Sequence, residues 1–172
     1  MVLNDLRGDD DVGLAFWSYR GFYASDGTPT PEALKSDLAK QWQRLQELGA
    51  TADRTEVWSY SLGSTFAPHL VADMCTANQA PQRLVLLATG IQIAGRPLGL
   101  LGRFKSSDID EGVSAKARVT CPVTIAHGSA DDAMQIYGAK KLAKTFGARM
   151  VVLEGKGHID LWQDARRELW GK

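Results

Sequence analysis

The stretch Val57-Trp58-Ser59-Tyr60-Ser61-Leu62-Gly63-Ser64 joins a short apolar run to a group of serines and a glycine. Apolar residues then recur at helical spacing up to Thr76, so the sequence predicts a strand, a sharp turn at Ser61 and a helix. The Ser-x-Gly pattern alone is weak, because Ser25-Asp26-Gly27 also matches it and lies among turn-forming residues. The informative feature of Ser61 is its position between a strand and a helix.

Strands and helices are predicted to alternate along the rest of the chain. Short apolar runs predict four further buried strands, at residues 12–17, 84–88, 123–126 and 150–153. Helical spacing predicts further helices, one between Thr30 and Gly49 and others over residues 133–146 and 159–170, and Pro68 should bend the helix after Ser61. We therefore expect an α/β fold with a mostly parallel sheet of about five strands and helices on both faces.

Composition limits the classes of protein to which the chain can belong. Its 172 residues, 44% apolar and 23% charged, suit a single domain over residues 1–172. Glycines interrupt the alternation of strands and helices at about residues 89–120, where we expect a flap or small cap. Twenty basic residues balance twenty acidic ones, so we expect a small-molecule substrate and no nucleic-acid or membrane partner. The first residues lack the apolar core of a leader or anchor, and Cys75 and Cys121 are typical of separate thiols; both features favour the cytoplasm.

Three reactive side chains follow predicted strands. Ser61 follows the second strand, Asp131 follows the strand at residues 123–126, and His158 follows the last strand. The carboxyl ends of parallel strands lie at one edge of a sheet, so these groups should converge there. A serine becomes a nucleophile when an imidazole takes its proton and a carboxylate orients that imidazole, while the amide of Leu62 can stabilise an oxyanion. We therefore expect a catalytic triad of Ser61, His158 and Asp131.

Other assignments are open at these positions. Asp131 can instead cap the next helix, and Asp132 is an alternative acid. His127 ends a strand and would brace the acid-bearing turn, whereas His69 lies inside a helix and is interpreted as structural. Arg20 can bind an acidic substrate group or fix a loop through backbone carbonyls. The histidine spacing matches no metal motif and no glycine-rich phosphate motif follows the first strand, so we expect neither a metal nor a cofactor.

Four blocks of sequence resemble those of the α/β-hydrolase-fold serine hydrolases, close to the esterase, acylhydrolase and serine-aminopeptidase-like branch. They are residues 18–27, the turn Ser59-Tyr60-Ser61-Leu62-Gly63, residues 121–131 and the loop Gly155-Lys156-Gly157-His158. The order Ser, Asp, His also matches that family. The resemblance implies hydrolysis of an ester, thioester or similar acyl bond, with Ser61 as the nucleophile and Asp131 rather than Asp132 as the acid.

The chain departs from the family at two places. Ser59 stands where the family usually has glycine, and the glycine-rich motif that supplies the second oxyanion donor is not found before Asp11. One missing donor typically lowers turnover by about 10²–10³. A strand that the family places between the runs at Val12 and Val57 is also missing. Three explanations are open: the two runs pair directly, another chain fills the gap, or the sequence is a fragment. The alternative function is accordingly a non-catalytic fragment or subunit that needs a partner strand or a second copy.

Overall fold

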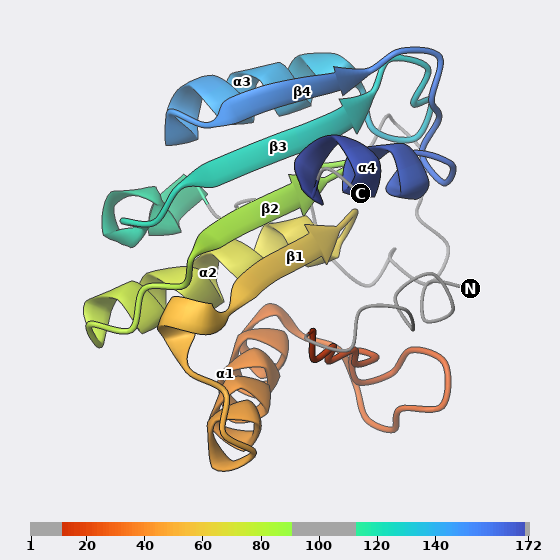
Figure 1. Ribbon diagram of the computed structural model, residues 1–172. Helices are drawn as coiled ribbons and strands as arrows, with labels where there is room; N and C mark the ends of the chain where they lie inside the picture. The colour runs from red at the N-terminus through yellow and green to blue at the C-terminus, as the bar shows by residue number, and fades with distance from the viewer. Residues whose placement is uncertain (1–11, 91–112, 171–172) are drawn as a thin grey trace.

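The computed structural model describes residues 12–90 and 113–170 and has a parallel sheet at its centre (Figure 1). Its four strands are β1 (Glu56–Tyr60), β2 (Arg83–Leu87), β3 (Val123–Gly128) and β4 (Arg149–Leu153), and they lie side by side in that order. Every neighbouring pair is parallel. This confirms the predicted α/β architecture, with four strands in the described residues instead of about five.

Helices cover both faces of the sheet, as predicted. They are α1 (Pro31–Glu47), α2 (Gly63–Thr76), α3 (Ile136–Phe146) and α4 (Trp162–Trp170), and short 3-10 turns lie at Ala52–Arg54 and Val113–Arg118. Apolar side chains of α2 and α3 pack together against one face, and α1 packs on α2. Helix α4 covers the opposite face (Figure 1).

The alternation of side chains along β2 divides the core into two layers. Leu84 and Leu86 point into the layer that holds α2 and α3, whereas Val85 and Leu87 point into the layer that holds α4. All four side chains are fully buried. A strand covered on both faces has no polar side, which explains why this segment is a continuous apolar run in the sequence.

The predicted strand at residues 12–17 is wrong. This segment forms neither strand nor helix, and Val12, Leu14, Phe16 and Trp17 are exposed. A short apolar run becomes a buried strand only where a neighbouring strand accepts its hydrogen bonds, and β1 pairs with β2 alone in the part of the sheet that the structure describes. Direct pairing of this run with β1 is therefore excluded in this structure.

The predicted helices exist, with some changes of boundary. The side chain of Thr30 caps α1 as expected, accepting a hydrogen bond from the backbone N–H of Ala33 at 3.2 Å. Helix α2 continues through Pro68, and the bend there stays a prediction. Helices α3 and α4 begin three residues later than predicted. Most of the proposed flap lies outside the described residues, and none of the described helices is long and apolar enough to cross a membrane.

A polar cluster at the amino-terminal end of β1 ties α4 to the sheet. Glu56 Oε2 accepts hydrogen bonds from the indole nitrogens of Trp58, at 2.7 Å, and Trp170, at 3.2 Å. Arg83 Nε forms an ion pair with the same oxygen at 2.9 Å. Burial alone would raise the pKa of Glu56, but these partners outweigh it and hold the pKa below its ordinary value.

Candidate active site

The turn between β1 and α2 presents Ser61 in a strained conformation. Ser61 has φ 51°, in the left-handed region that non-glycine residues rarely adopt. Its backbone N–H donates to the carbonyl of Leu87, at the end of β2, at 2.9 Å. Leu62 follows immediately before α2 begins, where helix geometry leaves N–H groups without acceptors inside the helix. The turn thus has the strained strand-to-helix geometry that the sequence predicted at Ser61.

The same turn accommodates Ser59 in place of the usual glycine. Ser59 Oγ donates to the Val85 carbonyl at 3.3 Å, so its hydroxyl is used within the sheet. A Cβ added to Gly63 would lie 3.6 Å from the Ser59 Cβ and 3.3 Å from the Tyr19 hydroxyl. A Cβ at Gly63 would therefore meet Ser59 at an ordinary van der Waals distance and would be tight only against the Tyr19 hydroxyl.

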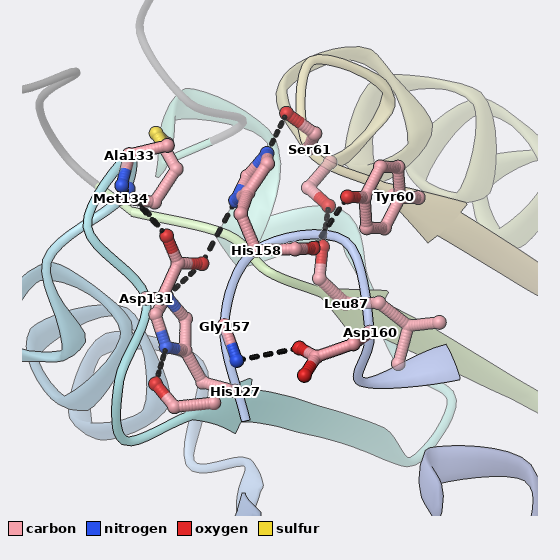
Figure 2. Close-up of polar contacts among 12 residues, drawn as sticks. Tyr60, Ser61, Leu87, His127, Asp131, Ala133, Met134, Gly157, His158 and Asp160 are labelled. Carbon is pink, nitrogen blue, oxygen red and sulfur yellow. Dashed lines mark hydrogen bonds and ion pairs between the residues drawn. The ribbon is translucent and has the colours of Figure 1, made fainter. Parts of the chain in front are cut away.

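The turn after β3 fixes the carboxylate of Asp131, which is buried. Its Oδ1 atom accepts hydrogen bonds from the backbone N–H groups of Ala133, at 3.0 Å, and Met134, at 2.8 Å. These contacts hold one carboxylate oxygen against the chain before α3, and that helix begins only at Ile136 because the backbone of Gln135 is extended, with φ −70° and ψ 132°. They also leave Oδ2 directed toward His158 (Figure 2). Asp132, the alternative acid, is exposed.

The loop that carries His158 packs tightly on the turn after β3. The backbone N–H of Ala130 donates to the Lys156 carbonyl at 2.9 Å, and that of Gly155 donates to Ser129 Oγ at 2.8 Å. A Cβ on Gly128 would lie 2.1 Å from the Lys156 carbonyl oxygen, a distance that no side chain can tolerate. Gly128 is therefore required for the loop to cross the end of β3.

The structure brings Ser61, His158 and Asp131 together at the carboxyl ends of the strands (Figure 2). Ser61 Oγ lies 2.9 Å from His158 Nε2, and His158 Nδ1 lies 2.8 Å from Asp131 Oδ2. A carboxylate accepts hydrogen bonds, so the neutral imidazole carries its proton on Nδ1 and offers the Nε2 lone pair to the serine hydroxyl. This is the arrangement needed for proton removal from Ser61.

The other histidines and Arg20 lie outside this chain of hydrogen bonds. His127 is fully buried; its Nδ1 donates to the Gly128 carbonyl at 2.9 Å, and its Nε2 lies 3.7 Å from Asp131 Oδ2. His69 is buried within α2. Arg20 Nε donates to Asp37 Oδ2 of α1 at 2.6 Å, so Arg20 fixes its loop through a carboxylate and not through the backbone carbonyls we expected.

Sequence reasoning missed a contact made by Tyr60. Its hydroxyl donates to the backbone carbonyl of His158, and its ring centroid lies 5.3 Å from that of the imidazole (Figure 2). The sequence offers one weak signal, an aromatic residue directly before the candidate nucleophile. No group of three or more His, Cys, Asp or Glu side chains in residues 12–90 and 113–170 is arranged to hold a metal ion.

Comparisons with known proteins locate similar chains. No family model matches the sequence. The chain is 27% identical to the lysophosphatidylserine lipase ABHD12 of zebrafish (Danio rerio) over 73% of this chain and 37% of that protein, so it spans a little over a third of that relative. It resembles the structure of an alpha-beta hydrolase of Vibrio vulnificus, with TM-score 0.64, 19% identity and coverage of 89% of this chain and 61% of that chain. The enol-lactonase of Burkholderia xenovorans gives TM-score 0.63, 17% identity and coverage of 88% and 76%.

Proposed function

Because the chain has the α/β-hydrolase fold, we propose that it is a serine hydrolase that cleaves an ester, thioester or related acyl bond. The observation that carries the proposal is the hydrogen-bonded sequence from Ser61 through His158 to Asp131, with distances of 2.9 and 2.8 Å. A structural serine in a turn needs no imidazole at hydrogen-bond distance from its hydroxyl, and no buried carboxylate behind that imidazole. Their combination at the carboxyl edge of the sheet favours catalysis.

In the proposed reaction, Ser61 Oγ attacks the carbonyl carbon of the substrate while His158 Nε2 takes the hydroxyl proton. Asp131 accepts the Nδ1 proton as a hydrogen bond throughout and stabilises the imidazolium. His158 then gives its new proton to the leaving alcohol or thiol, which yields an acyl-enzyme at Ser61. In the second half, water loses a proton to His158 and attacks the acyl carbon, and Ser61 recovers its proton as the acid product departs.

The tetrahedral oxyanion would be stabilised by the backbone N–H of Leu62. The start of α2 adds a favourable partial positive charge at the same place. With Leu62 as the one assigned donor, we expect turnover about 10²–10³ below that of a site with two donors. The proposed activity is therefore measurable most directly by a probe that reacts once with the nucleophile.

The proposed substrate is a small molecule with an acyl bond. The chain is partly similar to a protein named as a lysophosphatidylserine lipase and structurally similar to one named as an enol-lactonase, and both names denote cleavage of an ester-type bond. The chain has equal numbers of basic and acidic residues, which favours a substrate with little or no net charge.

The test is labelling with a fluorophosphonate, whose phosphorus forms a covalent bond to an activated serine. We expect wild-type protein to be labelled and Ser61→Ala to be unlabelled with an unchanged circular dichroism spectrum. Ser25→Ala is the matched control, because Ser25 begins the second Ser-x-Gly sequence and its exposed Oγ donates to the Ser18 carbonyl at 3.4 Å. Labelling retained in Ser61→Ala, or absent from the folded wild-type protein, would contradict the proposal.

A second candidate function rests on the edge of the sheet. Within the described residues the outer edge of β1 has no strand partner, and the apolar side chains at residues 12–17 are exposed. Such an edge favours pairing with another chain or a second copy, which would make this chain a subunit of a larger assembly. Size-exclusion chromatography and hydrogen exchange test this: a monomer with protected β1 amides contradicts it, whereas an obligate oligomer supports it.

A further inference from the structure

The loop that carries His158 depends on outside contacts for its position. Residues 154–161 form turns and bends without helix or strand. The contacts from Ala130 and Ser129 described above tie the start of this loop to the turn that holds Asp131. Within the loop, the backbone N–H of Gly157 donates to Asp160 Oδ1 at 2.6 Å. These contacts fix the loop relative to the carboxylate, and none of them fixes it relative to the nucleophile.

Tyr60 supplies a link to the nucleophile side. It is the last residue of β1 and pairs with Leu87 in the parallel sheet, so its backbone is held by β2. Its hydroxyl donates to the His158 carbonyl. Ser61, the next residue, contacts His158 at the other end, through the Nε2 atom of the ring. Two consecutive residues of one turn therefore hold His158 at its backbone and at its imidazole (Figure 2).

The ring of Tyr60 also lies against the imidazole. The two ring planes are tilted by 43° with their centroids 5.3 Å apart. This contact limits how far the imidazole can turn or shift away from Ser61. The charged groups around His158 are Asp131 behind the ring and Asp160 in its own loop, and both are negative when ionised.

The hydroxyl of Tyr60 remains a donor over the working range of pH. Burial raises its pKa above the ordinary value, and the negative charges of Asp131 and Asp160 raise it further. The tyrosine is therefore protonated at neutral pH and keeps a hydrogen to donate to the His158 carbonyl. A phenylalanine would keep the ring and lose this hydrogen bond alone.

We propose that Tyr60 is a positioning residue that sets the distance between the His158 imidazole and the Ser61 hydroxyl. It holds the histidine loop by the backbone carbonyl of His158 and rests its ring against the imidazole. The role rests on the proposed serine hydrolase function, because it acts through the proton transfer between Ser61 and His158. Tyr60 takes no part in the proton transfer or in the bond changes itself.

The decisive variant is Tyr60→Phe. Loss of the link lets the loop shift relative to the nucleophile, so the labelling rate constant at saturating fluorophosphonate should fall about 10-fold to 100-fold, since a 1 Å misplacement can cost about 10². The probe concentration at half-saturation should stay the same, because the hydroxyl is engaged by the protein backbone. Tyr60→Leu, which also removes the ring, should label more slowly than Tyr60→Phe.

The matched control is Tyr23→Phe, which removes the same hydroxyl from a side chain that is 98% exposed. Its labelling rate constant, half-saturation concentration and thermal midpoint should equal those of the wild-type protein. A labelling rate constant in Tyr60→Phe within twofold of wild type would overturn the proposal. A parallel rise in the half-saturation concentration would also overturn it, because that result indicates damage to probe binding.

A spectroscopic measurement separates this inference from the proposed function. The proton shared by His158 Nδ1 and Asp131 Oδ2 should give a downfield proton resonance in protein labelled with ¹⁵N-histidine, whether or not the protein reacts with the probe. In Tyr60→Phe that resonance should shift or broaden as the imidazole becomes less ordered, and in Tyr23→Phe it should not. Wild-type protein that does not react with the fluorophosphonate refutes the hydrolase proposal. A histidine resonance that is unchanged in Tyr60→Phe refutes the positioning role.

Discussion

Replacing Asp131 by asparagine should abolish most of the proposed activity by changing the tautomer of His158. Asp131 Oδ1 accepts hydrogen bonds from the N–H groups of Ala133 and Met134. An asparagine must keep its oxygen there, because the opposite orientation would bury two unsatisfied donors at about 1–3 kcal/mol each. Its NH₂ group then faces His158 Nδ1 at the position of Oδ2.

The tautomer change removes the base from the reaction. Facing an NH₂ group, His158 Nδ1 becomes an acceptor, so the ring proton moves to Nε2, which can then no longer take the proton of Ser61. The expected loss is about 10⁴-fold in the rate of the chemical step, or about 5 kcal/mol.

The assay is the labelling rate constant at saturating fluorophosphonate, supported by hydrolysis of a p-nitrophenyl ester. Asp132→Asn is the control, because it makes the same change at the exposed neighbouring residue and should leave the rate constant within about twofold. A rate constant for Asp131→Asn within tenfold of wild type, in a protein with an unchanged thermal midpoint, would refute the assignment of Asp131 as the residue that orients His158.

Two further predictions concern stability and loop geometry. Gly128→Ala should destabilise the protein by about 3 kcal/mol or more and lower the labelling rate, because its Cβ would lie 2.1 Å from the Lys156 carbonyl oxygen. Gly13→Ala is the control, because nothing lies within 4 Å of the new Cβ. It should change neither the thermal melt nor the labelling rate. Glu56→Gln should cost about 1–3 kcal/mol at pH 7. Since the folded pKa of Glu56 is below its ordinary value of 4.5, its stabilisation is present above pH 4.5 and is lost as the pH falls through the folded pKa, so the melting temperatures of variant and wild type should converge toward pH 3. A melting-temperature gap that stays constant from pH 7 to pH 3 would contradict this reasoning.

The local elements of the fold could be predicted because their signals are local. Strand β2 is an uninterrupted apolar run from Leu84 onward, and α1 has a capping residue, an initial proline and one buried stripe. The start of α3 was missed because the backbone of Gln135 is extended, and the periodicity of apolar residues does not report the backbone angles of a single residue. The failure at residues 12–17 has a different cause, since burial of an apolar run depends on whether a neighbouring strand is present.

The candidate site shows the same division. The convergence of Ser61, Asp131 and His158 could be anticipated because each residue follows a predicted strand, and parallel strands bring their carboxyl ends to one edge of the sheet. The residues alone left Asp131 and Asp132 open, and the family resemblance favoured Asp131; in the structure Asp131 Oδ2 lies 2.8 Å from His158 Nδ1, whereas Asp132 is exposed. The contact between Tyr60 and His158 joins residues 98 positions apart, and no spacing rule predicts it.

The proposed triad does not depend on the outer edge of β1. The turn at Ser61 is held by the hydrogen bond from its N–H to Leu87, at the end of β2, and Ser64 Oγ donates to the same carbonyl at 3.3 Å. Asp131 and His158 are held by the turns after β3 and β4. A strand added beside β1 would leave these contacts unchanged, because none of them involves the outer edge of β1. The reaction of Ser61 with a small phosphonate and the oligomeric state are therefore separate questions, and we expect Ser61 to be labelled in a monomer and in an oligomer alike.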